Sequence, residues 1–236
     1  MTWNVVETLR LVEQRHGKVL SALAAASLHS ANQRVRFAHI HYHAMRDLLA
    51  NFSNEAPQGA VLGLGWSRDE EARSKYFEFR DKMAANAVAC VQSIHAVADL
   101  LANGVYFSLR LDRFGKPLRD SQIDAKRTLQ RLDARPELAA LAGLLRAMLD
   151  DMSFKHVDAL SNQAKHRNIT PTALNEDATG LREPRFELRF SAFERDRNPF
   201  AEIEVQSLLS PAYDAVSHAI VSIGNELTRL LRSAQP

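Results

Sequence analysis

The chain contains few of the residues that would assign it to a specialised class of protein. Its single cysteine, Cys90, excludes an internal disulfide, and it lies in an apolar run that predicts a buried, unreactive thiol. With only 9 glycines and 8 prolines among 236 residues, the chain is neither collagen-like nor of low complexity. We find no internal repeat. An ordinary globular protein is therefore expected.

The chain also lacks a strong charge and a long uninterrupted apolar run. Its formal net charge is +2, so any binding of an anion must be local rather than due to a global field. The most apolar window, residues 87–109, is interrupted by Gln92, His95, Asp99 and Asn103, which argues against a membrane span. The first residues do not resemble a secretion signal. We expect a cytoplasmic protein without a membrane partner.

Apolar residues recur at helical spacing through most of the chain. One helix is predicted over residues 3–27, with Gly17 as a tolerated interior glycine, and a second over 32–52. Residues 53–66 contain Pro57 and three glycines and are predicted to form a loop. These two helices make up an N-terminal section, residues 1–52, of a single domain covering residues 1–236.

A bundle core is predicted over residues 67–168. Ser67 and Glu70 form a predicted capping box, from which a long central helix runs to Asn103–Gly104 or beyond. Shorter helices begin near residue 120 and near Pro136. After a break at 151–153, a further helix carries a polar motif and ends near residue 168.

Strand-like alternation appears late in the chain. Apolar and charged residues alternate over 186–190 and 201–206, which predicts a β-hairpin within 184–207. A last helix is predicted over 211–232, beginning at Ser210–Pro211. The predicted fold is thus mainly α-helical: a helical bundle with a long central helix and a β-hairpin before the C-terminal helix.

The motif Ser161–Asn162–Gln163–Ala164–Lys165–His166–Arg167 is the strongest functional signal. Asn162 and His166 are four residues apart, so on a helix their side chains project from one face, about 6 Å from each other. Such a pair can hold a phosphate, transfer a proton or bond a neighbouring loop.

A helical bundle with this motif resembles the HEPN superfamily (higher eukaryotes and prokaryotes nucleotide-binding). Its motif is an arginine, a polar residue that is often asparagine, three further residues and a histidine. Residues 162–166 match the last five positions, whereas Ser161 stands in place of the arginine. The resemblance implies a homodimer, and a metal-independent endoribonuclease or nucleotide-binding protein of a defence or toxin–antitoxin system.

By this resemblance His166 and Asn162 would be the catalytic residues, and Lys165, Arg167 and Ser161 would bind the phosphate. A serine carries no charge, so the missing arginine would weaken catalysis unless another cation, from this chain or a partner subunit, replaces it. The enzymatic assignment therefore stays uncertain. The simpler interpretation is a solvated helix end, where basic side chains complement the helix dipole.

A metal site is an alternative hypothesis. On a helix His39, His43 and Asp47 form one stripe, which could bind zinc or iron if a neighbouring helix supplied a further ligand. A Glu-x-x-His pair, Glu13 and His16, also occurs, but a di-iron bundle needs two such pairs. A half-buried polar stripe is the simpler interpretation.

The remaining polar groups favour structural roles. His95 and Asp99 are four apart in the apolar helix and predict a buried hydrogen-bonded pair. Arginines 182–197 are interleaved with acidic residues, which is typical of a solvated face. The sequence has no phosphate loop, nucleophile elbow or zinc-cysteine spacing, so no cofactor is predicted. The rival functional hypothesis is a non-enzymatic helical interaction protein with, for example, an antitoxin-like protein partner.

Overall fold

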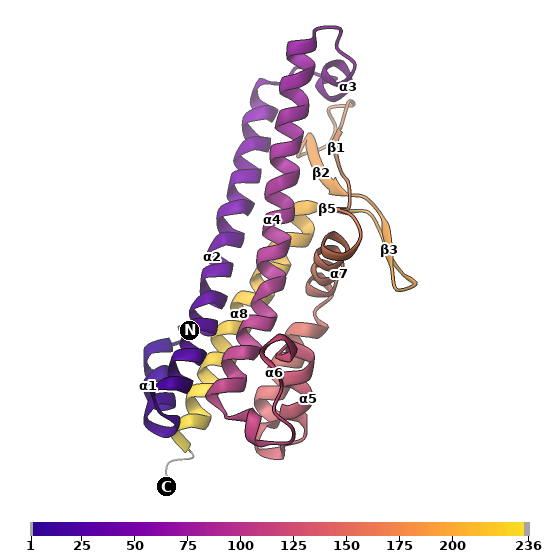
Figure 1. The fold of residues 1–236 in the computed structure, drawn as a ribbon. Helices are drawn as coiled ribbons and strands as arrows, with labels where there is room; N and C mark the ends of the chain where they lie inside the picture. Colours follow the sequence, from indigo (N-terminus) through magenta and orange to yellow (C-terminus); the bar gives the residue numbers. More distant parts are fainter. Residues whose placement is uncertain (1, 234–236) are drawn as a thin grey trace. The chain divides into compact units, whose positions relative to one another are not determined.

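The computed structural model describes residues 2–233, and they form a mainly α-helical fold with short strands before the last helix (Figure 1). This confirms the predicted fold class. The α-helices are α1 (Val5–His16), α2 (Lys18–Glu55), α3 (Ala60–Gly65), α4 (Glu70–Ser108), α5 (Ala125–Asp133), α6 (Ala139–Asp150), α7 (Met152–His166) and α8 (Val205–Ser233). The strands are β1 (Thr172–Glu176), β2 (Phe186–Phe190), β3 (Phe193–Arg195), β4 (Asn198–Phe200) and β5 (Ile203–Glu204).

The chain folds into two compact units, through both of which α2, α4 and α8 run. The first unit comprises Met1–Arg36, Ser93–Lys155 and Ala212–Pro236, and the second comprises Phe37–Gln92 and His156–Pro211. The motif helix, from His156 onward, and all five strands belong to the second unit.

The N-terminal helices divide at a different residue from the one predicted. Gly17 has a φ of 84°, which favours glycine, and it ends α1 rather than lying within a helix. The next helix, α2, then continues from Lys18 to Glu55 without the expected break near residue 30. Alanine and leucine are frequent in this region and favour a continuous helix. The predicted loop over 53–66 contains the short helix α3.

Helix α4 is the long central helix that the sequence predicted, although its cap is different. The Asp69 carboxylate accepts hydrogen bonds from the backbone N–H groups of Glu71 and Ala72, at 2.9 and 3.2 Å. Asp69 therefore satisfies backbone N–H groups of the first turn and caps the helix, in place of the predicted capping box of Ser67 and Glu70.

By length and composition alone, α4 is also the one helix among residues 2–233 that could cross a membrane. Of its most apolar window, 61 % is buried within the protein, which is the usual pattern for the core helix of a soluble protein.

In the first unit, two glycines are packed directly against side chains of other segments. Gly104 on α4 lies against the Leu28 side chain, and Gly224 on α8 lies against the Trp3 ring; a Cβ atom at either glycine would overlap its neighbour. Beside the second contact, the buried hydroxyls of Thr8 and Thr228 share a 2.6 Å hydrogen bond. These contacts join the segment from Trp3 to Thr8 to α8 within this unit.

The second unit contains a three-stranded antiparallel sheet of order β1–β2–β5 and a separate hairpin of β3 and β4. Thr172 to Glu176 pair with Phe190 to Phe186, whereas β5 pairs only with Arg189 and Phe190. The predicted pairing of residues 186–190 with residues 201–206 is present, but only as two residue pairs between β2 and β5. The prediction missed β1, which is the main partner of β2, and the separate hairpin of residues 193–200. One face of β2 buries Phe186, Leu188 and Phe190, as its alternation predicted.

The apolar face of β2 is covered within this unit by aromatic residues of α2 and α4. The Phe52 ring lies 5.1 Å from the Phe186 ring and 4.4 Å from the Phe79 ring, centroid to centroid. Further along the same two helices, Cys90 is buried and its thiol lies 3.4 Å from the carbonyl oxygen of Ala38. Burial raises the pKa of Cys90 to about 12. The prediction of a buried thiol is confirmed.

Helix α8 begins earlier than predicted. It starts at Val205, directly after β5, so Pro211 lies inside the helix instead of at its first turn. The Glu204 carboxylate caps the new start by accepting hydrogen bonds from the backbone N–H groups of Gln206, at 2.8 Å, and Ser207, at 2.5 Å. The predicted start at Ser210–Pro211 is therefore wrong by about one and a half turns.

Candidate functional site

The motif residues lie at the C-terminal end of α7, and the helix separates them into two sets. Lys165, His166 and Arg167 are exposed, whereas Ser161 is fully buried and Asn162 is partly buried. The Ser161 hydroxyl has no hydrogen-bond partner in the described structure. Ser161 therefore does not face solvent, where a phosphate ligand would bind.

Asn162 is bonded to its own helix. Its side-chain Nδ2 donates to the carbonyl oxygen and to a carboxylate oxygen of Asp158, each at 2.9 Å. The carbonyl of its side chain remains available as an acceptor. His166 makes no hydrogen bond or ion pair with another of residues 2–233. Asp158, Asn162 and His166 are spaced four apart, so they form one stripe along the outer face of α7.

An arginine from elsewhere in the chain joins this stripe. Arg195, at the end of β3, donates from Nη1 to the carbonyl oxygen of Asp158 at 3.2 Å, and this Nη1 lies 3.4 Å from the Asp158 carboxylate. Asn162 and Arg195 thus bond to the same carbonyl oxygen. The structure places a guanidinium on the turn of α7 that holds Asn162, although position 161 itself carries a serine.

The hairpin that carries Arg195 is anchored to α7 by aromatic contacts. The rings of Phe193 and Phe200 stack on each other at 4.9 Å, and His156 lies 5.8 and 5.2 Å from them. The Nε2 atom of His156 is buried without a hydrogen-bond partner. Burial lowers the pKa of His156, so its neutral form is favoured. The hairpin turn itself uses positive φ angles at Asp196 and Arg197, of 52° and 64°.

The metal hypothesis finds no support in the geometry. The rings of His39 and His43 lie 4.2 Å apart on α2. Nowhere in residues 2–233 do three or more histidine, cysteine or acidic side chains gather as a metal site would require, and this includes the stripe of His39, His43 and Asp47. His41, between the two, is instead hydrogen-bonded to Asn86 at 3.0 Å.

The other polar residues singled out in the sequence have structural contacts. His95 is buried, and Asp99 accepts a 3.0 Å hydrogen bond from the backbone N–H of Ala125 at the start of α5. Arg189 pairs with two glutamates near it in the sheet. Arg185 holds Glu176 and also donates to the carbonyl oxygens of Ala56 and Pro57. Several of these arginines therefore hold the fold together instead of forming a basic surface.

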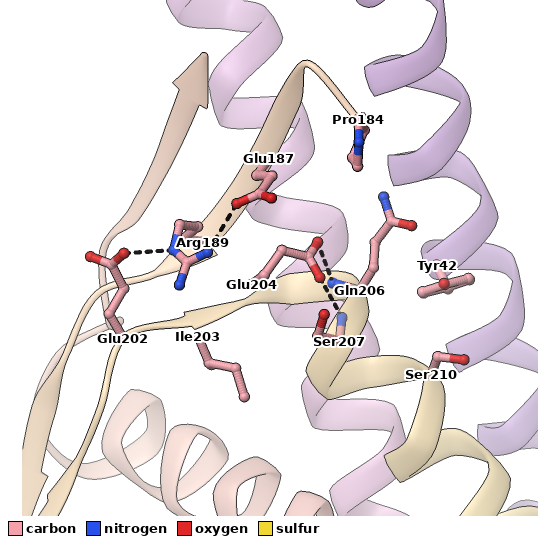
Figure 2. A pocket seen from close by; sticks show the side chains of 10 residues that line it. All are labelled: Tyr42, Pro184, Glu187, Arg189, Glu202, Ile203, Glu204, Gln206, Ser207 and Ser210. Atoms are coloured by element: carbon pink, nitrogen blue, oxygen red, sulfur yellow. Dashed lines mark hydrogen bonds and ion pairs between the residues drawn. The ribbon is translucent and has the colours of Figure 1, made fainter. Parts of the chain in front are cut away.

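A cavity of about 630 Å³ lies elsewhere in the second unit, between β2, β5, the first turns of α8 and Tyr42 of α2 (Figure 2). Its charged groups are already paired. Arg189 bonds Glu187 at 3.0 Å and Glu202 at 2.6 Å, and Glu204 is used as the cap of α8. The groups left to bind a ligand are neutral ones, such as the hydroxyls of Tyr42 and Ser210, so the cavity offers hydrogen bonds but no available acid–base pair.

Neither this cavity nor two smaller ones, of about 350 and 260 Å³, includes a residue of the motif. The candidate phosphate site lies outside these three cavities, and its Lys165, His166 and Arg167 are exposed. Sequence reasoning missed Arg195, because Glu194 and Asp196 on either side of it suggested a locally neutral turn. Comparison of the chain with protein-family models, with curated proteins and with solved structures found no match.

Proposed function

We propose that this chain is a HEPN-like protein that binds the phosphates of RNA or a nucleotide along the outer face of α7. The contacts are made by Lys165 and His166, with the Arg195 guanidinium and the Asn162 side-chain carbonyl one to two turns away. One helical turn rises about 5.4 Å, so the groups of this stripe are spaced along the helix axis and do not converge on one point. An open stripe of this kind suits a strand better than a small enclosed ligand.

The position of Arg195 is the observation that supports this proposal most directly. It donates to the same Asp158 carbonyl oxygen as Asn162, so it adds a cation beside a motif that has a serine in place of the arginine. An arginine presents five N–H donors. Nη1 of Arg195 contacts Asp158 and its Nε lies 3.4 Å from the Asp196 carboxylate, so the N–H groups of Nη2 are left without a partner among residues 2–233. The remaining donors can bind a phosphate oxygen.

Binding, rather than cleavage, is the function that we propose. Metal-independent cleavage of RNA needs a base, an acid and a charge stabiliser held in fixed geometry. Ser161 is buried, and the exposed imidazole of His166 is not oriented by another residue in the described part of the chain. A single unsupported imidazole is a poor proton-transfer device.

The test is fluorescence anisotropy with a labelled single-stranded RNA in excess chelator, with a gel of the same samples to detect cleavage. Lys165→Ala/His166→Ala should weaken binding several-fold and lower the salt dependence of log K by about one unit per lost cation. Lys126→Ala, which removes an exposed lysine of α5, is the matched control. Equal binding by the double variant and the control would refute the proposal, and cleavage abolished by His166→Ala would show that the protein is a nuclease instead.

A further inference from the structure

The cavity of about 630 Å³ in the second unit contains uncharged polar side chains that the protein itself does not use. These are Tyr42, Gln206, Ser207 and Ser210, and none of their side chains makes a hydrogen bond with another of residues 2–233. Figure 2 shows Tyr42 and Ser210 on the opposite side of the cavity from Arg189. A hydroxyl and a carboxamide both donate and accept hydrogen bonds. These four residues, the neutral wall of the cavity, therefore offer donors and acceptors together.

The charged residues of the cavity are engaged with one another or with the backbone. Arg189 bonds Glu187 and Glu202, and both carboxylate oxygens of Glu204 accept from backbone N–H groups at the start of α8. A cationic ligand would have to compete with Arg189 for its carboxylates. An anionic ligand would meet three carboxylates and one guanidinium. An uncharged ligand avoids both costs.

The size of the cavity fits a ligand of moderate length. Its volume lies within the range of roughly 300–1,000 Å³ that is typical of small-molecule sites. It corresponds to about twenty water molecules at roughly 30 Å³ each, which is close to the number of non-hydrogen atoms in a disaccharide. Tyr42 and Gln206 are half-buried, so hydrogen bonds to a ligand there would be partly shielded from water.

Two smaller cavities continue from this one on either side of Pro184. Pro184 and Gln206 also line the cavity of about 260 Å³, and Pro184, Glu187 and Arg189 also line the cavity of about 350 Å³. All of their lining residues belong to the second unit. A ligand made of linked units can therefore extend from the central cavity into either neighbour.

We propose that this cavity binds an uncharged saccharide of two or more sugar units. Sugar hydroxyls both donate and accept hydrogen bonds, as the side chains of the neutral wall do. The C–H face of a sugar ring can pack against the apolar surface that Tyr42, Pro184 and Ile203 contribute. The saccharide is bound and not cleaved, because the cavity has no available acid–base pair. The proposal is independent of phosphate binding at α7.

Other small molecules fit the cavity less well. A polyamine has only donors, so it would leave the side-chain N–H groups of Gln206 without an acceptor. A nucleotide or a sugar phosphate would bring its negative charge close to Glu187, Glu202 and Glu204. An extended peptide is held mainly by backbone hydrogen bonds along a strand, whereas the neutral wall is made of side chains from α2 and α8.

The test is isothermal titration calorimetry of the whole chain with the disaccharides maltose, cellobiose and lactose, and with glucose, glucose phosphate and spermidine for comparison. We expect at least one disaccharide to bind, more tightly than glucose and than either charged compound. Gln206→Ala/Ser210→Ala should weaken its binding by about tenfold or more, because two hydrogen-bonding groups are lost. Alanine favours helix at both positions, so the fold should be kept. Tyr42→Phe, which removes only a hydroxyl, should weaken binding several-fold.

Ser74→Ala/Gln92→Ala is the matched control, since both residues are exposed on α4 and neither lines any of the three cavities. Circular dichroism establishes that each variant is folded. The proposal is overturned if none of the three disaccharides binds at millimolar concentration, or if Gln206→Ala/Ser210→Ala binds the disaccharide like the control. It is also overturned if spermidine or glucose phosphate binds more tightly than every saccharide and loses affinity in the cavity variant.

Discussion

The guanidinium of Arg195 and the backbone carbonyl of Asp158 are joined by a 3.2 Å hydrogen bond across 37 positions of sequence. This bond attaches the β3–β4 hairpin to the turn of α7 that precedes Asn162. The same carbonyl also accepts from Asn162, so the two donors share one anchor. A cation and a polar side chain are thereby held together on an open helical face.

Replacing Arg195 should weaken RNA binding more than replacing its neighbour Arg197. We expect Arg195→Ala to reduce affinity several-fold and to lower the salt slope by about one unit, because one phosphate contact is lost. Arg197→Ala removes the same charge from the exposed turn and should have little effect. Anisotropy titrations at two salt concentrations make the comparison. If both variants lose affinity equally, binding depends only on the total positive charge of the hairpin and Arg195 has no specific role.

Glu176 should be a major determinant of the stability of the second unit. Its carboxylate is only 5 % exposed, accepts hydrogen bonds from the backbone N–H groups of Gly59 and Val61 at 2.8 and 2.9 Å, and pairs with Arg185. Glu176→Gln leaves Arg185 without its countercharge and should cost about 2 kcal/mol. Urea unfolding measures this loss. Glu183→Gln, at an exposed position, should change the free energy of unfolding by less than about 0.5 kcal/mol.

The same residue predicts a dependence on pH. Burial raises the pKa of Glu176, but the hydrogen bonds from Val61, Arg185 and Gly59 outweigh it, so the pKa lies below 4.5. The stabilisation is complete above pH 4.5 and is lost as the pH falls through the lowered pKa. The wild type should therefore lose more stability below pH 4.5 than Glu176→Gln does. Parallel loss in both proteins would show that other carboxylates dominate.

His156→Phe should make the second unit less sensitive to acid. Burial holds the pKa of His156 below 6.5, so the stability that depends on the neutral ring is present above pH 6.5 and declines as the pH falls below it. Phenylalanine keeps the contact with Phe193 and Phe200 and removes a buried polar atom without a partner. We expect equal or slightly higher stability at neutral pH, by up to about 1 kcal/mol, and a smaller decline at mild acidity.

The control for this variant is His29→Phe, at an exposed position on α2. Burial also lowers the pKa of His16, so some dependence on pH should persist in every variant. Chemical unfolding followed between neutral and mildly acidic pH separates these contributions. An unchanged pH dependence in His156→Phe would mean that its ring is solvated when the hairpin is docked.

Gly224→Ala should destabilise the first unit, whereas Gly143→Ala should not. A Cβ atom at Gly224 would overlap the rigid Trp3 ring, and relieving the overlap should cost about 1–3 kcal/mol. At Gly143, on α6, a Cβ atom meets open space, and alanine favours the helix by about 1 kcal/mol. Thermal unfolding should show opposite shifts. Similar shifts would mean that Trp3 can move away at little cost.

The long helices were predictable because their apolar spacing extends without a breaker, as in α4 and α7. The first and last residues of these helices were harder to predict. Gly17 could equally lie inside a helix or end one, and only its φ of 84° decides between the two. The start of α8 depends on Glu204, which reaches its backbone N–H partners only after β5 has paired with β2.

The sheet shows a different limit of local patterns. The alternation of β2 was evident, but β1 buries only Leu174, so Thr172–Glu176 carried too weak a signal to predict a strand. The site has the same limit. Lys165 and His166 could be placed on the helix from their spacing alone. Arg195 reaches α7 through a long-range contact that the spacing of residues does not encode. The burial of Ser161 depends likewise on the tertiary packing of α7.

The burial of Cys90 has a practical consequence. Thiol reagents attack the thiolate, and a pKa of about 12 together with burial protects this side chain from them at neutral pH. Because the chain has no other cysteine, one introduced at an exposed position such as Val19 or Leu62 would carry a fluorophore or spin label alone. Labels attached in this way would report only on the introduced position, because Cys90 does not react with them.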